Sequence, residues 1–348
     1  MSEQIQQFGT ETPINHVKKG FAPLSEQINN YEQELKNRPQ TICTGFGGID
    51  KDFKINGFTM LGGASGSGKT SLCLNIALKR AEKKLTTIFY SLEMPVYTLV
   101  NRLVCISRNV DYLHAPDFWR DFQQNNATAL QYIYFVGGKD LLTDSSTTPN
   151  FDTGENSELI TTIKQLQQTQ KDILLIVDSL HLLPANTADL RAATNENVIK
   201  IRQLTDNYNI SCLVIGQSKR GEKSFEYVSD IYDKQTGQFD TAQLRAQFRE
   251  SALIEYAADA LFYLLNDKQP PDALNTAKKW LCMVKNRIAD AGLYSTNKII
   301  GFTLNDKYLF VEKYNYQNAV QDNTETPPTA ETAQKTAKTA QKQQFRTK

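Results

Sequence analysis

The chain contains the stretch Gly63-Ala64-Ser65-Gly66-Ser67-Gly68-Lys69-Thr70, which fits the pattern Gly-x-x-x-x-Gly-Lys-Ser/Thr of a phosphate-binding loop. The apolar run at 58–61 predicts a buried strand before it, and residues 71–83 after it carry apolar side chains at helical spacing. Glycines let consecutive backbone N–H groups face a polyphosphate, and the following helix adds the positive end of its dipole. A glycine-rich turn that met the pattern by chance would lack these flanks, so the sequence predicts a nucleoside triphosphate site.

The loop supplies side chains as well as backbone groups. The Lys69 ammonium is expected to reach the β and γ phosphates, and the Thr70 hydroxyl is expected to bind Mg²⁺. We therefore predict ATP and Mg²⁺ as cofactors, and we count Lys69 among the catalytic residues as well. The residues assigned to nucleotide binding are Gly63, Ala64, Ser65, Gly66, Ser67, Gly68, Lys69, Thr70 and Ser71.

Two predicted strands lead to carboxylates. Residues 173–178 form a continuous apolar run that ends in Asp178, and residues 86–92 lead to Glu93. The carboxyl ends of parallel strands face the ligand crevice, so Asp178 is placed to hold Mg²⁺ opposite Thr70. Hydrolysis also needs a base that orients and deprotonates water, and Glu93 is the best candidate.

A polar amide follows a third apolar strand. Residues 212–216 lead to Gln217, whose amide is placed to sense the γ phosphate and to relay its presence to the segment that follows. Taken singly, Asp178, Glu93 and Gln217 each have a plainer explanation as a polar residue that begins a turn. As a set on neighbouring strand ends they indicate a catalytic site.

Composition places the chain among ordinary globular proteins. Its 348 residues allow one large α/β domain with extensions or two small domains, and 40% hydrophobic with 22% charged residues is usual for that class. A net charge of +1 means that any contact with nucleic acid depends on a local basic cluster. The five cysteines are scattered singly, which indicates neither a zinc site nor a disulfide framework. We find no membrane span and no signal-peptide core, so we expect a cytoplasmic protein without a membrane partner.

Strands and helices alternate from Thr41 to about Glu312, which predicts an α/β fold with a mainly parallel central sheet. Residues 137–156 are expected to form a polar, irregular insertion. The predicted strands are 57–62, 86–91, 131–136, 173–178, 210–216, 260–265, 280–285, 299–304 and 308–312, the last two as a hairpin. The predicted helices lie near 71–83, 95–107, 157–169 and 196–208.

The segments at the two ends of the chain differ from this domain. The apolar residues Leu24, Ile28, Tyr31 and Leu35 form one narrow stripe on a predicted helix. So short a helix must dock to be stable, either on its own domain or on a neighbouring subunit. The predicted organisation is a mobile arm at 1–23, a linker helix at 24–40, an ATPase domain at 41–316 and a disordered tail at 317–348.

Short stretches occur along the chain in a recognisable order: Thr44-Gly-Phe…Ile49-Asp50, the loop at 63–70, Ser91-Leu-Glu-Met94, Leu175-Ile-Val-Asp178, Gln217, Arg249-Glu-Ser251…Ile254-Glu255 and Lys285-Asn-Arg287. In this order they resemble the motifs of DnaB-type replicative helicases. The resemblance covers about residues 24–312 and implies a RecA-like motor domain preceded by a linker helix. We expect no counterpart of the family's N-terminal domain, which engages primase.

The resemblance also implies function. It implies an ATP-hydrolysing DNA helicase of DNA replication that forms a ring, expected to be a hexamer, moves 5′ to 3′ on single-stranded DNA, and meets a loader or a primase. It gives the strand-end carboxylate and amide the roles of base and γ-phosphate sensor. It assigns Lys285 and Arg287 to the ATP site of the neighbouring subunit, although from the residues alone they would be a solvated edge. It places Arg249 and Glu250 in the loop that grips the single strand.

The segment 217–250 combines cations with aromatic rings. Cations follow the phosphates of a single strand and rings stack on its bases, whereas a solvated surface flap is the plainer alternative. We assign DNA binding to Lys219, Arg220, Arg249 and Glu250. Further basic and aromatic residues of the segment are Lys223, Lys234, Arg245, Phe225, Tyr227, Tyr232 and Phe248.

Two functions of different classes are therefore expected. The first is an ATP-dependent, ring-forming helicase or translocase that acts on single-stranded DNA. The second is a RecA-like ATPase that uses its nucleotide state to regulate or assemble partners without separating strands. The paired cations at 285 and 287 and the basic segment favour the first.

Overall fold

The computed structural model describes residues 41–137, 151, 153–155, 157–216, 225–233, 238–248, 252–269, 271, 275–287 and 299–315, together with Leu24, Ile28 and Glu32. The chain divides into two units, residues 1–39 and residues 40–348. The three described residues of the first unit are helical, and Leu24 and Ile28 are 71% and 50% exposed. Within these described ranges, no helix has the length and apolar character needed to cross a membrane.

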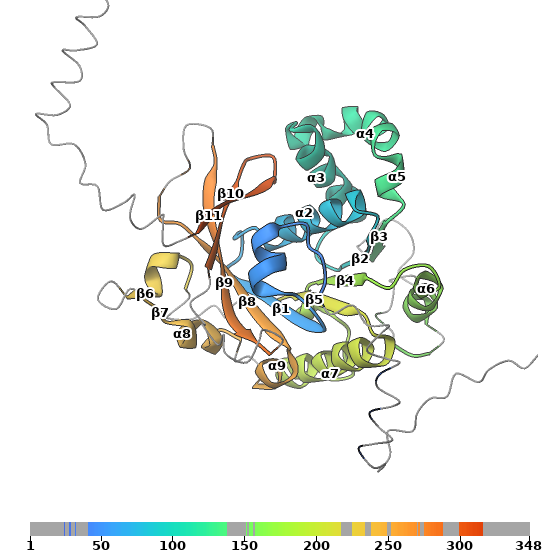
Figure 1. Cartoon of the computed structure of the whole chain (residues 1–348), viewed down its shortest axis with the longest axis vertical. Coiled ribbons are helices and arrows are strands. Elements are labelled where there is room, and N and C mark those ends of the chain that lie inside the picture. Colours follow the sequence, from blue (N-terminus) through green and yellow to red (C-terminus); the bar gives the residue numbers. More distant parts are fainter. Residues whose placement is uncertain are drawn as a thin grey trace, which may run out of the picture. The chain divides into compact units, whose positions relative to one another are not determined.

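The second unit is built on a sheet of nine strands in the order β11-β10-β9-β8-β1-β5-β4-β2-β3 (Figure 1). β1 (Phe58–Gly63) lies between β5 (Ser211–Ile215) and β8 (Ala260–Asn266) and is parallel to both. The parallel part continues through β4 (Ile173–Asp178), β2 (Thr86–Ser91) and β3 (Ile133–Gly137). The mainly parallel α/β sheet predicted from the sequence is confirmed.

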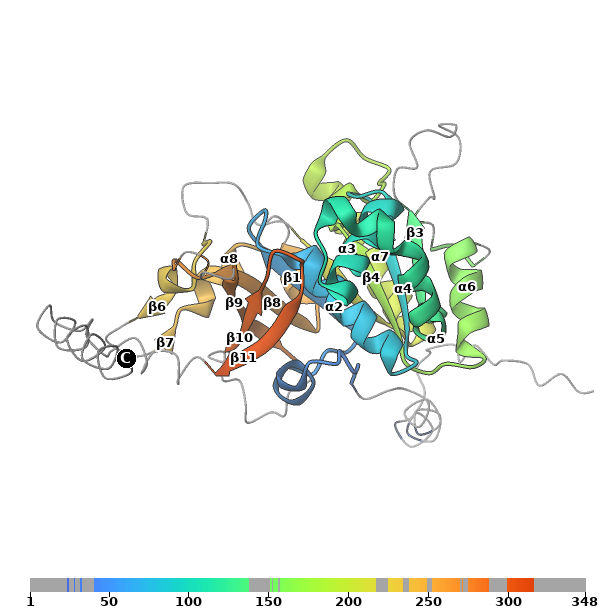
Figure 2. The same cartoon turned by 90° about the horizontal axis from the view of Figure 1, so that it is seen from above.

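The other end of the sheet is an antiparallel extension. Here β9 (Ala277–Asn286), β10 (Ile299–Leu304) and β11 (Phe310–Asn315) follow β8, each antiparallel to its neighbour. Figure 2 shows this extension on the side of the sheet away from β3, with the short strands β6 (Tyr232–Asp233) and β7 (Gln238–Phe239) near it. The hairpin expected from the last two predicted strands is β10 with β11.

Helices cover both faces of the sheet. α2 (Lys69–Glu82) and α3 (Val96–Arg108) contribute to one apolar cluster, and α6 (Glu158–Gln167) and α7 (Leu190–Tyr208) contribute to another. The short helices α8 (Thr241–Ala246) and α9 (Ala252–Ala257) belong to the second cluster. The remaining short elements are η1 (Ile49–Phe53), η2 (Tyr112–Phe118), α4 (Trp119–Asn125), α5 (Ala127–Leu130), η3 (Leu180–Leu182) and η4 (Val228–Asp230).

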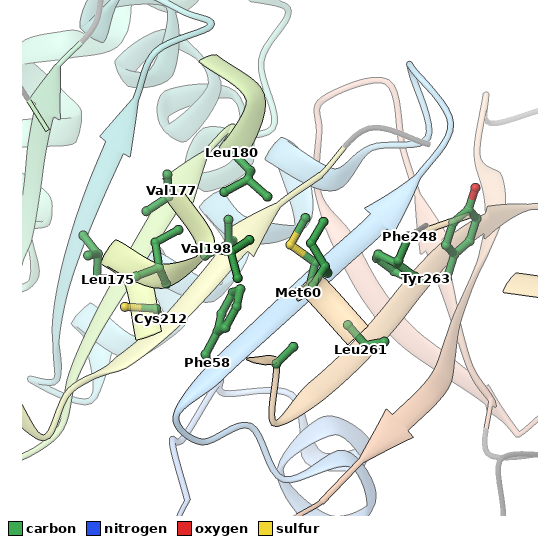
Figure 3. Close-up of a cluster of buried hydrophobic side chains, with 14 of the residues drawn as sticks. Phe58, Met60, Leu175, Val177, Leu180, Val198, Cys212, Phe248, Leu261 and Tyr263 are labelled. Atoms are coloured by element: carbon green, nitrogen blue, oxygen red, sulfur yellow. The ribbon is translucent and has the colours of Figure 1, made fainter. Parts of the chain in front are cut away.

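β1 separates the two cores. Successive side chains of a strand point to opposite faces, so Phe58 and Met60 belong to one cluster and Leu61 to the other. Figure 3 shows Phe58 and Met60 beside Val198 of α7 and Leu261 of β8. Phe58 is fully buried, and removing such a ring costs about 3–5 kcal/mol of folding free energy. The strand that leads to the phosphate loop is therefore fixed from both sides.

Two sequence predictions need correction in detail. The helix expected to begin at residue 196 begins at Leu190, because Asp189 caps it by accepting a hydrogen bond of 2.9 Å from the Arg191 N–H. No element was expected between α3 and β3, where η2, α4 and α5 lie. Residues 138–150 of the predicted insertion, and the predicted tail from 317, lie outside the described residues. Phe151 of that insertion is part of the core, with an exposed fraction of 2%.

Candidate nucleotide-binding site

The phosphate loop joins β1 to α2, as its flanks predicted. Gly68 caps α2 with a φ of 102°, and a Cβ at this position would lie 3.1 Å from Leu304 and 3.2 Å from Phe310. A residue with a side chain would be strained there by its backbone and crowded by these neighbours. The Lys69 ammonium donates hydrogen bonds to the carbonyl oxygens of Gly63, at 2.8 Å, and Ala64, at 2.7 Å. The lysine therefore crosses the loop and lies on its inner side.

The proposed magnesium ligands meet. Thr70 Oγ1 donates to Asp178 Oδ2 at 2.7 Å, while Asp178 Oδ1 is buried and has no hydrogen-bond partner among the described residues. Burial raises the pKa of the Asp178 carboxyl to about 6, against the hydrogen bond from Thr70, which lowers it. A buried carboxylate oxygen without a donor, beside a hydroxyl, fits an oxygen-preferring cation such as Mg²⁺.

Lys69 faces two carboxylates from inside the protein. Burial lowers the pKa of its ammonium to about 8, and the negative charges of Asp178 and Glu93 oppose that shift. The side chain is only 7% exposed. A buried cation at the start of a helix, where the dipole is also positive, is a strong attractor for an anionic ligand.

Glu93 reaches the site on a tight turn after β2. Ser91 Oγ accepts a hydrogen bond of 3.2 Å from the Met94 N–H, and the Leu92 N–H donates to the carbonyl oxygen of Asp178 at 2.7 Å. These contacts hold the end of β2 against the end of β4. Glu93 is exposed and lines the same pocket as the phosphate loop, as its assignment as base requires.

The pocket has a volume of about 300 Å³. At the end away from the loop, the guanidinium of Arg102 lies 4.9 Å from the ring centroid of Tyr308. The Nε atom of Arg102 is buried without a hydrogen-bond partner among the described residues. The lining comprises Ser65, Gly66, Gly68, Lys69, Thr70, Ser71, Glu93, Met94, Arg102, Asp178, Ile215, Leu304 and Tyr308. An anion-binding end and a flat stacking end suit a nucleotide.

Asn75 of α2 holds the hairpin tip that carries Tyr308. Its Nδ2 donates to the Tyr308 carbonyl oxygen at 2.8 Å, and its Oδ1 accepts from the Phe310 N–H at 3.1 Å. Tyr308 has a φ of 63°, a conformation that costs energy for an aromatic residue and persists only where its surroundings impose it. Sequence reasoning missed Arg102, Asn75 and Tyr308, because they meet only in three dimensions.

The predicted cation pair lies at the opposite edge of the sheet. Lys285 is level with Leu261 and Met60 in the strand register, and the Arg287 N–H bonds the carbonyl oxygen of Asp259 just before β8. Arg287 is thus level with the beginning of β1, five residues or about 17 Å below Gly63. Neither cation reaches the phosphate loop of its own chain.

The predicted nucleic-acid residues Lys219, Arg220, Arg249 and Glu250, and the predicted sensor Gln217, lie outside the described residues. The ends of that segment are described. Gly216 and Phe248 line one small cavity with His181, at the carboxyl ends of β4 and β5. Any loop between them therefore begins and ends on the same edge of the sheet as the nucleotide pocket.

Some residues of that segment are engaged within the fold. Phe248 is 5% exposed and packs edge-on against Tyr263, with ring centroids 5.9 Å apart. The ring of Tyr232 packs on Phe239 at 5.1 Å. Arg245 pairs with Glu255 at 3.6 Å. The hypothesis that the Phe248 ring stacks on bases is therefore wrong, because this ring belongs to the core.

Comparison with known proteins covers most of the chain. The pattern of residues that defines the family described as "DnaB-like helicase C terminal domain" matches residues 41–297. A protein of Rickettsia bellii (strain RML369-C) named Replicative DNA helicase DnaB is 24% identical over 71% of this chain and 49% of its own length. Its namesake in Rickettsia felis (strain ATCC VR-1525 / URRWXCal2) is 20% identical over 74% of this chain and 53% of its own length. The chain spans about half the length of these curated relatives.

Two solved structures are similar in fold. One is the ATPase domain of another protein, with a TM-score of 0.55 at 14% identity, and the match covers 85% of this chain and 100% of that one. The other, "The Structure Of A DnaB-Like Replicative Helicase And Its Interactions With Primase", has a TM-score of 0.54 at 16% identity and covers 84% of this chain and 67% of that one. At these identities the likeness shows the fold, and it confirms the RecA-like architecture that the motifs implied.

Proposed function

The chain belongs to the family of the DnaB-like helicase C-terminal domain, as its motifs implied, and on this premise we propose that it is an ATP-driven DNA helicase of DNA replication. It hydrolyses ATP with Mg²⁺, assembles into a ring, expected to be a hexamer, and moves 5′ to 3′ along single-stranded DNA. A loader or a primase is the class of protein partner that this proposal implies, and the cytoplasm is the expected location.

The observation that carries the proposal is the separation of the cation pair from the phosphate loop. Arg287 is exposed, and about 17 Å of strand lies between its level in the sheet and Gly63. A cation of this kind serves hydrolysis only when another subunit offers it a phosphate. Supply of such an arginine in trans stabilises charge in the transition state and is worth about 10³-fold or more in turnover. Two half-sites on opposite edges therefore support a ring of subunits.

Within one pocket, each residue has a distinct role. Lys69 pairs with the phosphates, Thr70 and Asp178 would hold the cation, and Glu93 accepts the proton of the attacking water. Magnesium, when bound, supplies positive charge to the phosphoryl oxygens. The stacked pair of Arg102 and Tyr308 would support the nucleoside end.

Exposed apolar side chains support assembly. Leu113, Trp119 and Phe118, from η2 and α4, are 87%, 42% and 36% exposed. Leu24 and Ile28 of the helical residues before the domain are exposed as well. An exposed apolar group of this kind marks a contact surface. We assign the helix at 24–40 of one subunit to the η2–α4 surface of its neighbour.

The proposal is tested by strand displacement on forked duplexes that carry a 5′ or a 3′ single-stranded tail, beside ATPase assays with and without single-stranded DNA. We expect unwinding with the 5′ tail and stimulation of ATPase by DNA, and loss of both in Lys69→Ala. Affinity for the single strand should fall with salt, with a log–log slope of about −0.7 per phosphate neutralised.

Two variants of the predicted DNA loop refine this test. Replacing Lys219 and Arg249 by Ala should make the salt dependence shallower and abolish DNA stimulation, while basal ATPase and ring formation stay in place. ATPase activity with no unwinding, no DNA stimulation and no salt dependence would instead establish the RecA-like ATPase that regulates partners without separating strands.

A further inference from the structure

A shielded ion pair lies at the amino edge of the sheet. Arg202 of α7 donates from one nitrogen, Nη1, to both carboxylate oxygens of Asp259, at 2.8 and 2.9 Å. Asp259 is 16% exposed at its side chain and lies in the turn between α9 and β8. The pair is less screened than a surface salt bridge, and removing one partner leaves a partly buried charge.

The same aspartate grips the first residue of β1. Asp259 Oδ2 accepts a hydrogen bond of 3.0 Å from the Phe58 N–H, and the Asp259 N–H donates to the Phe58 carbonyl oxygen at 2.7 Å. The chain makes room for this carboxylate at Gly57, which has a φ of 60°, since a Cβ there would lie 2.3 Å from Asp259 Oδ2. Asp259 thus holds the beginning of the strand that ends at the phosphate loop.

Asp259 also holds the backbone of Arg287. Its carbonyl oxygen accepts a hydrogen bond of 2.8 Å from the Arg287 N–H. Two residues earlier, the Lys285 ammonium donates to the carbonyl oxygen of Ala258 at 2.7 Å and to that of Glu255. The end of β9 that carries both cations is therefore fastened to residues 255–259.

A bulge in β9 sets the direction of this end. Leu261 pairs with Lys285 while Phe262 pairs with Met283, so Val284 is the extra residue. The Val284 carbonyl oxygen accepts a hydrogen bond of 3.3 Å from Arg245. Bulges turn the strand and redirect the side chains that follow.

We propose that Asp259 is a positioning residue, which holds Arg287 in the orientation that the neighbouring subunit's ATP site requires and ties that orientation to β1 of its own chain. This inference rests on the proposed role of Arg287 in trans. Through Asp259, a displacement of the phosphate-loop strand in one subunit would move the cation presented to the next. The alternative is that the Arg202–Asp259 pair only stabilises the fold.

The test compares Asp259→Asn with Asp206→Asn. Asp206 binds the same arginine, with its Oδ2 at 2.9 Å from Arg202 Nε, but it lies on α7, and no contact of its own with β1 or Arg287 is described. For Asp259→Asn we expect turnover to fall about tenfold or more, with affinity for a fluorescent ATP analogue within about twofold of the parent. For Asp206→Asn we expect both quantities within about twofold of the parent.

A double-mutant cycle separates positioning from stability. In an Arg287→Ala background, Asp259→Asn should lower turnover no further, because the positioned group is gone. An equal fall of turnover in both backgrounds, or parental turnover in Asp259→Asn, overturns the inference. If Asp259→Asn does not fold, Arg202→Gln replaces it, since it removes the ion pair and leaves both contacts to Phe58. If Arg287→Ala itself keeps parental turnover, the proposed trans site fails instead.

Discussion

The two edges of the central sheet are built for different distances. At the carboxyl edge, Lys69, Thr70, Asp178 and Glu93 from three neighbouring strand ends share one pocket. At the amino edge, Lys285 and Arg287 are held by backbone bonds within the chain, and the phosphate loop is out of their reach. One edge is therefore a nearly complete site, and the other is the missing part of a site elsewhere. The difference teaches that a subunit of this kind is a poor enzyme alone.

The largest effect should come from removing the amino-edge arginine. Arg287→Ala should bind ATP as the parent does and lose about 10³-fold in turnover, the usual scale for an arginine supplied in trans. Steady-state ATPase and equilibrium binding of a fluorescent nucleotide measure the two quantities. Arg120→Ala, which removes an exposed arginine of α4, is the matched control and should change neither.

Mixing variants sharpens this comparison of edges. Lys69→Ala lacks a working carboxyl edge and Arg287→Ala lacks a working amino edge, so rings that contain both recover activity where an intact pocket meets an intact arginine. Recovery upon mixing, with none in either variant alone, requires a site shared between subunits. If the mixture stays as inactive as its components, the two edges do not cooperate across an interface.

The next effect concerns the carboxyl edge alone. Glu93→Gln keeps the shape of the side chain but cannot accept a proton, so turnover should fall by at least about 10²-fold while ATP still binds. Glu158→Gln, an exposed carboxylate at the start of α6, should leave turnover unchanged. Parental hydrolysis by Glu93→Gln would transfer the role of base to another carboxylate.

A smaller effect is expected at the nucleoside end of the pocket. Tyr308→Ala removes the ring that faces Arg102 and should raise the KM for ATP about tenfold, with kcat within about twofold. Tyr308→Phe keeps the ring and should behave as the parent. Tyr97→Ala, an exposed tyrosine of α3 outside the pocket, serves as control. A change in kcat instead of KM would show that Tyr308 serves the chemistry.

The smallest effect is a pH dependence at the amino edge. Burial, and then the positive charge of Arg287, lower the pKa of Lys285 to about 8. The unfolded chain keeps this proton to about pH 10.4, so between these values the unfolded state binds more protons and stability from this group rises with pH. The advantage of the parent over Lys285→Met in free energy of unfolding should grow from pH about 7 to about 10. Because Lys285 is half-exposed, the growth should stay below about 1 kcal/mol. Urea denaturation measures it, and an advantage that shrinks with pH would contradict the assignment.

The sequence predicted the carboxyl edge better than the amino edge for a physical reason. The phosphate loop, Asp178 and Glu93 each follow an apolar run whose length and polarity give the strand and its end, so β2, β4 and β10 have the predicted limits. Neighbouring strand ends then bring the residues together without further information. Local pattern and parallel topology were sufficient here.

The rest depends on contacts between residues distant in sequence. Asp259 meets Phe58 and Arg202 across the fold, and nothing in the residues around it marks it. The polar surface of η2 and α4 gave no helical stripe, so these helices were not expected. Arg102 lay within a predicted helix, but its meeting with Tyr308 needs the tertiary fold.

The position of β1 between two apolar cores also has a consequence for how the molecule opens. Every residue of β1 is buried, and the strand is bonded to β5 on one side and β8 on the other. Freeing one of its amides requires both faces of the sheet to come apart, so amide hydrogen exchange should find β1 among the slowest segments of the chain. The exposed tip of the loop that it carries, at Ser65 and Gly66, should exchange among the fastest. The most yielding backbone of the site is thus anchored directly to the least yielding.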